Sequence, residues 1–242
     1  MPPSICIIEV DADPIVPLLE RVRVAAALSR QVAEHFAPLW GVTATVRVAT
    51  PDAPPRDDEW RLELWRVPQP GGPFGYHDVT PAGVPRLIVF PELASWSVCA
   101  SHEVLEALAD PYIRRCVQAP DGSIWALEVC DACEDETYVV DGVEVSDFCT
   151  PQWFEPPKAP TEQTRYSYAG RCLAPFHILP GGYGQVFDPK RGWQRRAGGE
   201  LLPHRTTIAD LGVSRGGRRR DAVPQNLPWW RKLLSGLVSR FS

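Results

Sequence analysis

The feature that most constrains this chain is an almost wholly apolar segment that contains four ionisable side chains. Over residues 94–109 apolar residues stand at nearly every position around a helical turn, which predicts a buried helix. His102, Glu106 and Asp110 follow one another at intervals of four residues, so they lie along one face of that helix. Glu103 lies beside the same face. A buried helix with this polar stripe needs a partner for its charges.

A bound cation would satisfy these side chains, because buried charge is costly unless it is paired or coordinated. A His and a carboxylate four residues apart can hold one ion from one face of a helix, as the two His of a His-Glu-x-x-His helix do. We therefore predict His102 and Glu106 as metal ligands and Glu103 as a general base toward water. The alternative is a structural set of ion pairs with Arg86, Arg114 or Arg115.

Catalytic zinc sites usually take three protein ligands, so one more is expected. Glu128 is preferred because it lies 26 residues after His102, which leaves room for the chain to turn back over the helix. Asp131 and Asp110 are further candidates, either as ligands or as supports of the ligands. In a strand Glu128 and Asp131 would face opposite sides, so one of them is expected to face the site. The alternative is that the acidic run at 128–136 is a solvated hairpin face.

The seven cysteines are spread over the whole chain, which is not the pattern of a small disulfide framework. Cys130 and Cys133 form a single Cys-x-x-Cys pair, and Cys149 follows at an irregular distance. Structural zinc sites usually combine two such pairs. The pair is therefore a competing metal site that lacks its second half.

Short strands precede the motif helix and hairpins follow it. Apolar runs and alternating patterns predict strands before the helix at residues 5–10, 43–49, 60–67 and 86–90. A long helix is predicted over residues 14–37, opening at Pro14. Later strands are predicted at residues 123–129, 137–140 and 143–145. Asp141-Gly142 predicts a type I′ turn between the last two. The fold class that follows is α+β, a mixed sheet with a long N-terminal helix and a buried motif helix.

The charge is unevenly distributed along the chain. Residues 190–242 hold 12 Lys/Arg against 3 Asp/Glu, which is a net charge of +9. The whole chain has a net charge of −5, so residues 1–189 have a net charge of −14. We therefore expect a metal-binding domain at 1–189 and an irregular basic extension at 190–242. Residues 230–241 have apolar side chains at helical spacing, which predicts an amphipathic helix at the end of the extension.

The segment 222–242 is expected to dock a protein partner, to pack on its own domain or to lie on a membrane. The basic residues at 214–220 have no interleaved aromatic residues, so specific nucleic-acid binding is not predicted. The first residues lack the basic and apolar regions of a signal peptide. No apolar run approaches the roughly 20 residues of a transmembrane helix.

Three stretches resemble an uncharacterised family of bacterial and phage zincin-like metallopeptidases with a His-Glu-x-x-Glu motif, many of which are described as virion-associated. They are Gly75-Tyr76-His77-Asp78, the motif from residue 101 through Asp110-Pro111, and Glu128-Val129-Cys130-Asp131. The similarity extends to residues 145–148 and 151–154 and covers about residues 5–190. The order strand, long helix, two strands, edge segment, strand and motif helix also resembles the N-terminal half of zincins.

The resemblance implies a zincin-like fold in which His102 and Glu106 bind zinc and Glu103 is the catalytic base. It also implies that Tyr76 and His77 border the cleft and contact an extended peptide substrate. Glu106 stands where zincins usually have a second His, and this harder ligand set also suits Ca²⁺ or Mn²⁺. We expect a metal-dependent peptidase or, alternatively, a non-catalytic component of a phage-like particle that docks neighbours through its tail. The location expected is cytoplasmic or virion-associated.

Overall fold

The computed structural model describes residues 2–11, 13–66, 74–93, 95–198 and 208–210. A first sheet has the strand order β2-β1-β3-β5-β4. Its strands are β1 (Ser4–Glu9), β2 (Thr45–Val48), β3 (Trp60–Leu64), β4 (Gly75–Val79) and β5 (Pro85–Val89). The first four in that order are parallel, and β4 pairs antiparallel with β5 at the edge. Ile5, Cys6 and Ile7 of the inner strand β1 are all fully buried, as in parallel strands covered on both faces.

A continuous helical segment follows β1 and has three parts. They are α1 (Leu18–Arg30), a π-helical part η1 (Gln31–Phe36) and α2 (Ala37–Trp40). The helix begins after Pro17, later than the predicted start at Pro14, because a proline disfavours helical backbone at the residue before it. It ends at Gly41, whose φ of 70° gives the left-handed cap that glycine adopts without strain.

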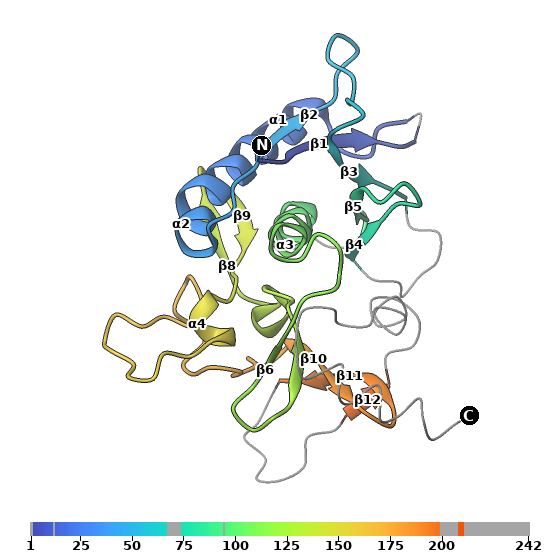
Figure 1. Ribbon diagram of the computed structural model, residues 1–242. Helices are drawn as coiled ribbons and strands as arrows, with labels where there is room; N and C mark the ends of the chain where they lie inside the picture. Colours follow the sequence, from blue (N-terminus) through green and yellow to red (C-terminus); the bar gives the residue numbers. More distant parts are fainter. Residues whose placement is uncertain (1, 12, 67–73, 94, 199–207, 211–242) are drawn as a thin grey trace, which may run out of the picture.

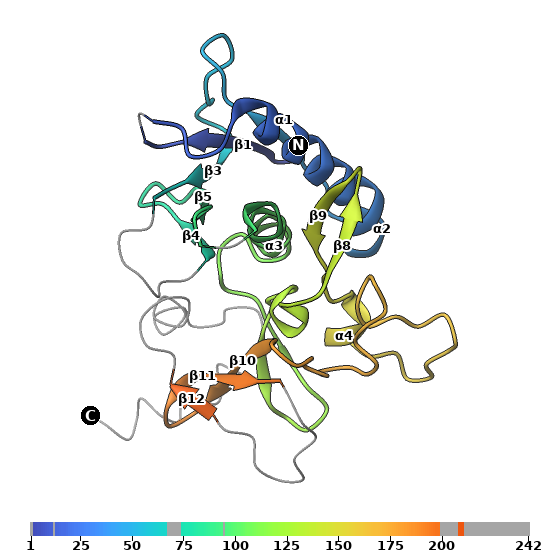
Figure 2. The same ribbon diagram turned by 180° about the vertical axis from the view of Figure 1, so that it is seen from behind.

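The motif helix α3 (Trp96–Ala109) lies at the centre of the molecule (Figures 1 and 2). It contacts β4 and β5 on one side and, on the other, the hairpin of β8 (Thr137–Val140) and β9 (Val143–Ser146). Its residues from Ala100 to Ala109 are all buried, which confirms the prediction from its apolar pattern. The predicted turn is also confirmed, since Asp141 and Gly142 have φ of 50° and 75°.

A second sheet lies beyond α3 and has the order β12-β11-β10-β7-β6. Its strands are β6 (Cys116–Gln118), β7 (Ile124–Ala126), β10 (Tyr183–Asp188), β11 (Gly192–Ala197) and β12 (Ile208–Asp210). Two short helices, η2 (Asp131–Cys133) and α4 (Pro151–Phe154), lie between β7 and β10 in the sequence. The α+β class is confirmed by this mixture of sheets and helices.

The domain boundary predicted after residue 189 lies between two paired strands. β10 pairs with β11 along their full lengths, from Tyr183 with Ala197 to Asp188 with Gly192. The boundary therefore falls inside a hairpin, and residues 190–197 belong to the second sheet. The predicted amphipathic helix at 230–241 and the docking segment 222–242 lie outside the described residues. Within the described part of the chain, no helix is long and apolar enough to cross a membrane.

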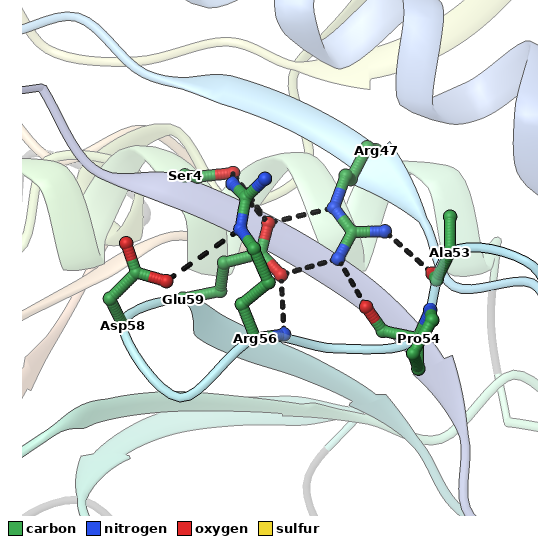
Figure 3. Close-up of polar contacts among 7 residues, drawn as sticks. All are labelled: Ser4, Arg47, Ala53, Pro54, Arg56, Asp58 and Glu59. Carbon is green, nitrogen blue, oxygen red and sulfur yellow. Dashed lines mark hydrogen bonds and ion pairs between the residues drawn. The ribbon is translucent and has the colours of Figure 1, made fainter.

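A buried ion-pair network fastens the start of the first sheet (Figure 3). Glu59, only 1 % exposed, accepts hydrogen bonds from Ser4 Oγ at 2.8 Å, from Arg47 Nε at 2.7 Å and from the Arg56 backbone N–H at 2.8 Å. These bonds join β1, β2 and the turn before β3. The Arg47 guanidinium is the main reason that the pKa of Glu59 falls from 4.5 to about 2.

Glu59→Gln is expected to lower the free energy of unfolding by about 2 kcal/mol at neutral pH, because a charge-assisted hydrogen-bond acceptor is lost. The pKa of Glu59 is depressed in the folded state, so its stabilisation is present above pH 4.5 and is lost as the pH falls toward 2. The gap between wild type and variant in urea unfolding should therefore close over that range. Asp58→Asn, at a side chain 78 % exposed, is the control. A gap that did not change with pH would contradict this assignment.

Candidate metal centre

A hydrogen-bond network fixes the rotation of α3 about its axis. Ser101, fully buried, donates from its hydroxyl to Gln31 Oε1 at 2.8 Å and accepts from the Ser146 backbone N–H at 3.1 Å. Gln31 in turn donates to the Ser146 carbonyl at 3.0 Å and to the Tyr138 hydroxyl at 3.0 Å. Ser101 is thus tied to η1, to β8 and to β9. The next residue, His102, lies about 100° further round the helix axis, because an α-helix has 3.6 residues per turn.

His102 lies in the first of two imidazole–carboxylate clusters. Its Nε2 is 3.1 Å from Glu106 Oε1, one helical turn away, and 3.3 Å from Asp131 Oδ1 at the start of η2. Its Nδ1 is 3.7 Å from Glu134 Oε2. His102, Glu106 and Asp131 are buried, while the Glu134 side chain is 28 % exposed. An i, i+4 pair and an irregular segment after β7 therefore meet at one imidazole nitrogen.

His77 lies in the second cluster. It comes from the edge strand β4, and its Nδ1 is 3.4 Å from Glu103 Oε2 and 3.8 Å from Glu106 Oε2. One ligand atom each from His77, Glu106 and Glu128 lie within 4.8 Å of one another. The Glu106 carboxylate thus stands between two imidazoles, with Oε1 toward His102 and Oε2 toward His77.

These side chains could hold a metal ion. Among the described residues, three groups have ligand atoms mutually within 4.8 Å: His102 with Glu106 and Cys130, His102 with Asp131 and Glu134, and His77 with Glu106 and Glu128. An ion with bonds of 2.0–2.1 Å to tetrahedral ligands separates neighbouring ligand atoms by about 3.3 Å. The separations of 3.1 and 3.3 Å around His102 Nε2 agree with that spacing. The donor set of imidazole and carboxylate therefore fits a divalent cation.

The carboxylates and imidazoles change one another's proton affinity. Burial, followed by the charge on Asp131, raises the pKa of Glu106 from 4.5 to about 8. Burial alone would lower the pKa of His102, but the charges on Glu106 and Glu134 outweigh it and raise that pKa well above 6.5. A cation at this centre would compete with protons for the same atoms.

The structure brings both acidic candidates from the region after β7 to the centre. The expectation that only one of Glu128 and Asp131 faces the site is wrong, because they do not share a strand. β7 ends at Ala126, short of the predicted 129, and Asp131 begins η2. Glu128 joins the group of His77, and Asp131 joins that of His102.

Other predicted residues lie next to the centre. Asp110 is buried and accepts hydrogen bonds from the backbone N–H groups of Arg114 at 3.0 Å and Arg115 at 2.8 Å, which shapes the turn after α3. It belongs to none of the three metal-binding groups found in the described part of the chain. Tyr76 is half-buried, with its ring 6.3 Å from that of Phe90.

The sequence indicated His77 as a substrate contact, and the structure places its side chain, 3 % exposed, among the possible ligands. Its position depends on a close approach of β4 to α3. A Cβ at Gly75 would lie 3.2 Å from Glu103 Cγ, so glycine leaves the space that the approach needs. Gly75 and His77 are two residues apart in a strand and so share a face. A glycine two residues before a histidine in a strand is therefore a sequence signal that the histidine faces a closely packed neighbour, here α3.

The Cys-x-x-Cys pair is divided between two sets of neighbours. Cys130 donates from its thiol to the His102 carbonyl at 3.8 Å, which places it at the metal centre. The neighbouring thiols of Cys149 and Cys172, followed by burial, raise the pKa of the Cys133 thiol well above 9.0. Cys133 belongs to none of the three groups of possible ligands in the described part of the chain, so the structure does not bring Cys130 and Cys133 together in one of them.

The clustered side chains could hold a metal ion. Glu103 belongs to none of the three groups among the described residues, and it contacts His77 of the second cluster at 3.4 Å. This is an arrangement suited to ion binding and to proton transfer at a neighbouring atom. Comparisons of the chain with protein families, with curated proteins and with solved structures found no match.

Proposed function

We propose that this protein is a metal-dependent hydrolase of the zincin-like class, with zinc as the ion and peptides as substrates. One observation carries the proposal. His102 Nε2 and Glu106 Oε1 are 3.1 Å apart on one turn of a buried helix, with Asp131 Oδ1 3.3 Å from the same nitrogen. Glu103 stands beside them on the same helix.

The first sheet supports the zincin-like assignment and the choice of substrate. Its edge strand β4 runs antiparallel to β5 and contacts α3. In zincins the corresponding edge borders the cleft and aligns an extended substrate. An edge strand can accept a peptide as a further strand through backbone hydrogen bonds. Tyr76 on β4 remains our prediction for a substrate contact.

When bound, the ion supplies Lewis acidity toward a carbonyl oxygen and a coordinated water. Glu103 accepts the proton of the attacking water, and then donates it to the leaving amine. His77, whose Nδ1 is 3.4 Å from Glu103 Oε2, orients this carboxylate. The hydrolytic step requires that Glu103 keep a basic oxygen next to the ion.

His102→Ala is expected to lower the zinc content by one ion per chain, because the variant loses the nitrogen around which Glu106 and Asp131 gather. The measurement is elemental analysis of purified protein after dialysis against zinc-free buffer. His177→Ala is the matched control, since its Nδ1 accepts a hydrogen bond from the Leu173 backbone and it lies in none of the three groups. Wild-type protein without zinc would overturn the proposal.

The burial of the centre favours a second candidate, a structural ion in a non-catalytic component of a phage-like particle. Glu103 is 1 % exposed and Glu106 is 0 % exposed, whereas a hydrolase must bring its substrate bond to the ion. This candidate predicts bound zinc without hydrolysis. Glu103→Gln distinguishes the two, because it removes the base that only a hydrolase uses.

A further inference from the structure

We propose that the centre holds two divalent cations bridged by the Glu106 carboxylate. The first ion is held by His102 and Glu106, with Asp131 beside the same His102 nitrogen, and the second by His77, Glu106 and Glu128. The inference rests on the proposed metal centre and adds to it a second ion, which the motif alone does not imply.

The two oxygens of Glu106 face different imidazoles. Oε1 is 3.1 Å from His102 Nε2, and Oε2 is 3.8 Å from His77 Nδ1. A carboxylate placed in this way can bind one ion with each oxygen, which is how carboxylates bridge the ions of two-metal sites about 3.5–4 Å apart. His102 and His77 come from different elements, α3 and β4, so each ion has a nitrogen ligand of its own.

The second group contains a buried imidazole nitrogen, on His77, that lacks a hydrogen-bond partner among the described residues. His77 is 7 % exposed, and the nitrogen in question is its Nε2. A buried polar atom without a partner is costly, and because Nδ1 is hydrogen-bonded to Glu103 at 3.4 Å, Nε2 is the nitrogen that is left to bind the second ion. Gly75 keeps β4 close to α3, since a Cβ there would lie 3.2 Å from Glu103 Cγ.

The charges also agree with two ions. Four buried carboxylates converge on the two imidazoles: Glu103, Glu106, Glu128 and Asp131. Two divalent cations would offset the negative charge of these four, and a fifth carboxylate, the partly exposed Glu134, lies 3.7 Å from His102 Nδ1. Neutral imidazoles are the form that binds metals. Imidazole and carboxylate together suit Zn²⁺ and Mn²⁺.

The test is a zinc titration of the metal-free full chain by isothermal calorimetry, checked by elemental analysis. Wild type should bind two zinc ions per chain, and His77→Ala and His102→Ala should each bind one. Glu128→Gln keeps the side-chain size and should weaken only the second ion, by about 100-fold or more. This variant decides the question if His77→Ala does not fold, as judged by circular dichroism.

Mn²⁺ gives an independent readout. With two equivalents bound, wild type should give the electron paramagnetic resonance spectrum of a spin-coupled pair, and Glu128→Gln the six-line spectrum of an isolated ion. One zinc per chain in wild type, lost in His102→Ala and kept in both His77→Ala and Glu128→Gln, would overturn the second ion while leaving the proposed function in place. Wild type that binds no zinc would overturn both.

Discussion

Replacing Glu103 by Gln is expected to lower kcat for peptide hydrolysis by about 10³-fold while the zinc content stays that of wild type. The amide has the size of the carboxylate, but it cannot accept a proton from the attacking water. Glu103 belongs to none of the three groups of possible ligands among the described residues, so the ions should remain. The measurement is a peptide-library assay on zinc-loaded protein, with zinc determined on the same samples.

Glu136→Gln is the control for the loss of one carboxylate outside the centre. Glu136 is outside the three groups, and its side chain, 35 % exposed, pairs with Arg171 at 3.5 Å. This variant should keep wild-type activity. Unchanged hydrolysis by zinc-loaded Glu103→Gln would remove Glu103 as the base, and loss of zinc would place it among the ligands instead. Absence of hydrolysis in zinc-loaded wild type itself would favour the structural-ion candidate.

The parts of the centre that could be predicted are those fixed by a single helix. In α3 the apolar residues around every side determine burial, and the intervals between His102, Glu103 and Glu106 determine which face they share. Neither property depends on distant parts of the chain. Four of the five strands of the first sheet, all except β4, were predicted for the same reason, since alternation and apolar runs are local patterns.

The contributions of distant segments could not be predicted in this way. Glu128 reaches the centre because β7 stops at Ala126 and the chain turns into η2, and that ending depends on tertiary contacts such as the bond from the Cys149 backbone N–H to the Val129 carbonyl at 2.6 Å. His77 reaches it because β4 pairs with β5. Both depend on contacts between residues far apart in the sequence. The spacing of apolar residues in a strand or a helix reports only on local structure and does not predict such contacts.

The hairpin at residues 183–197 could not be predicted for a different reason. Lys190, Arg191 and Gly192 have the composition of a solvated tail, and the same composition forms a tight turn. In the structure Asp188 Oδ1 accepts hydrogen bonds from the backbone N–H groups of Lys190 and Arg191, both at 2.8 Å, and Gly192 has a φ of 77°. Composition alone does not distinguish the two outcomes.

Gly182→Ala is expected to destabilise the fold by about 3 kcal/mol and to weaken zinc binding in the same variant. Gly182 precedes β10 and lies against η2. A Cβ on it would lie 2.6 Å from the Ala132 carbonyl oxygen and 2.9 Å from that of Asp131. Both are backbone atoms, so no side chain can rotate to make room.

The surrounding hydrogen bonds prevent Gly182 from moving away. Its N–H donates to the Leu179 carbonyl at 3.0 Å, and its own carbonyl accepts from the Gly198 N–H at 2.8 Å. The Leu179 N–H donates in turn to the Ala132 carbonyl at 2.9 Å. The added methyl group must therefore displace η2, which carries Asp131 and its contact with His102.

Urea unfolding of metal-free protein and zinc titration of the folded protein measure the two effects separately. Gly192→Ala is the matched control on the same hairpin: a Cβ there meets nothing within 4 Å, so only its φ of 77° opposes the change, at a cost of about 1–2 kcal/mol and with no loss of zinc affinity. If Gly182→Ala lost stability but kept its zinc affinity, the backbone of η2 would have yielded without moving Asp131. The ion would then be held mainly by α3 and β4, the elements that carry His102, Glu106 and His77.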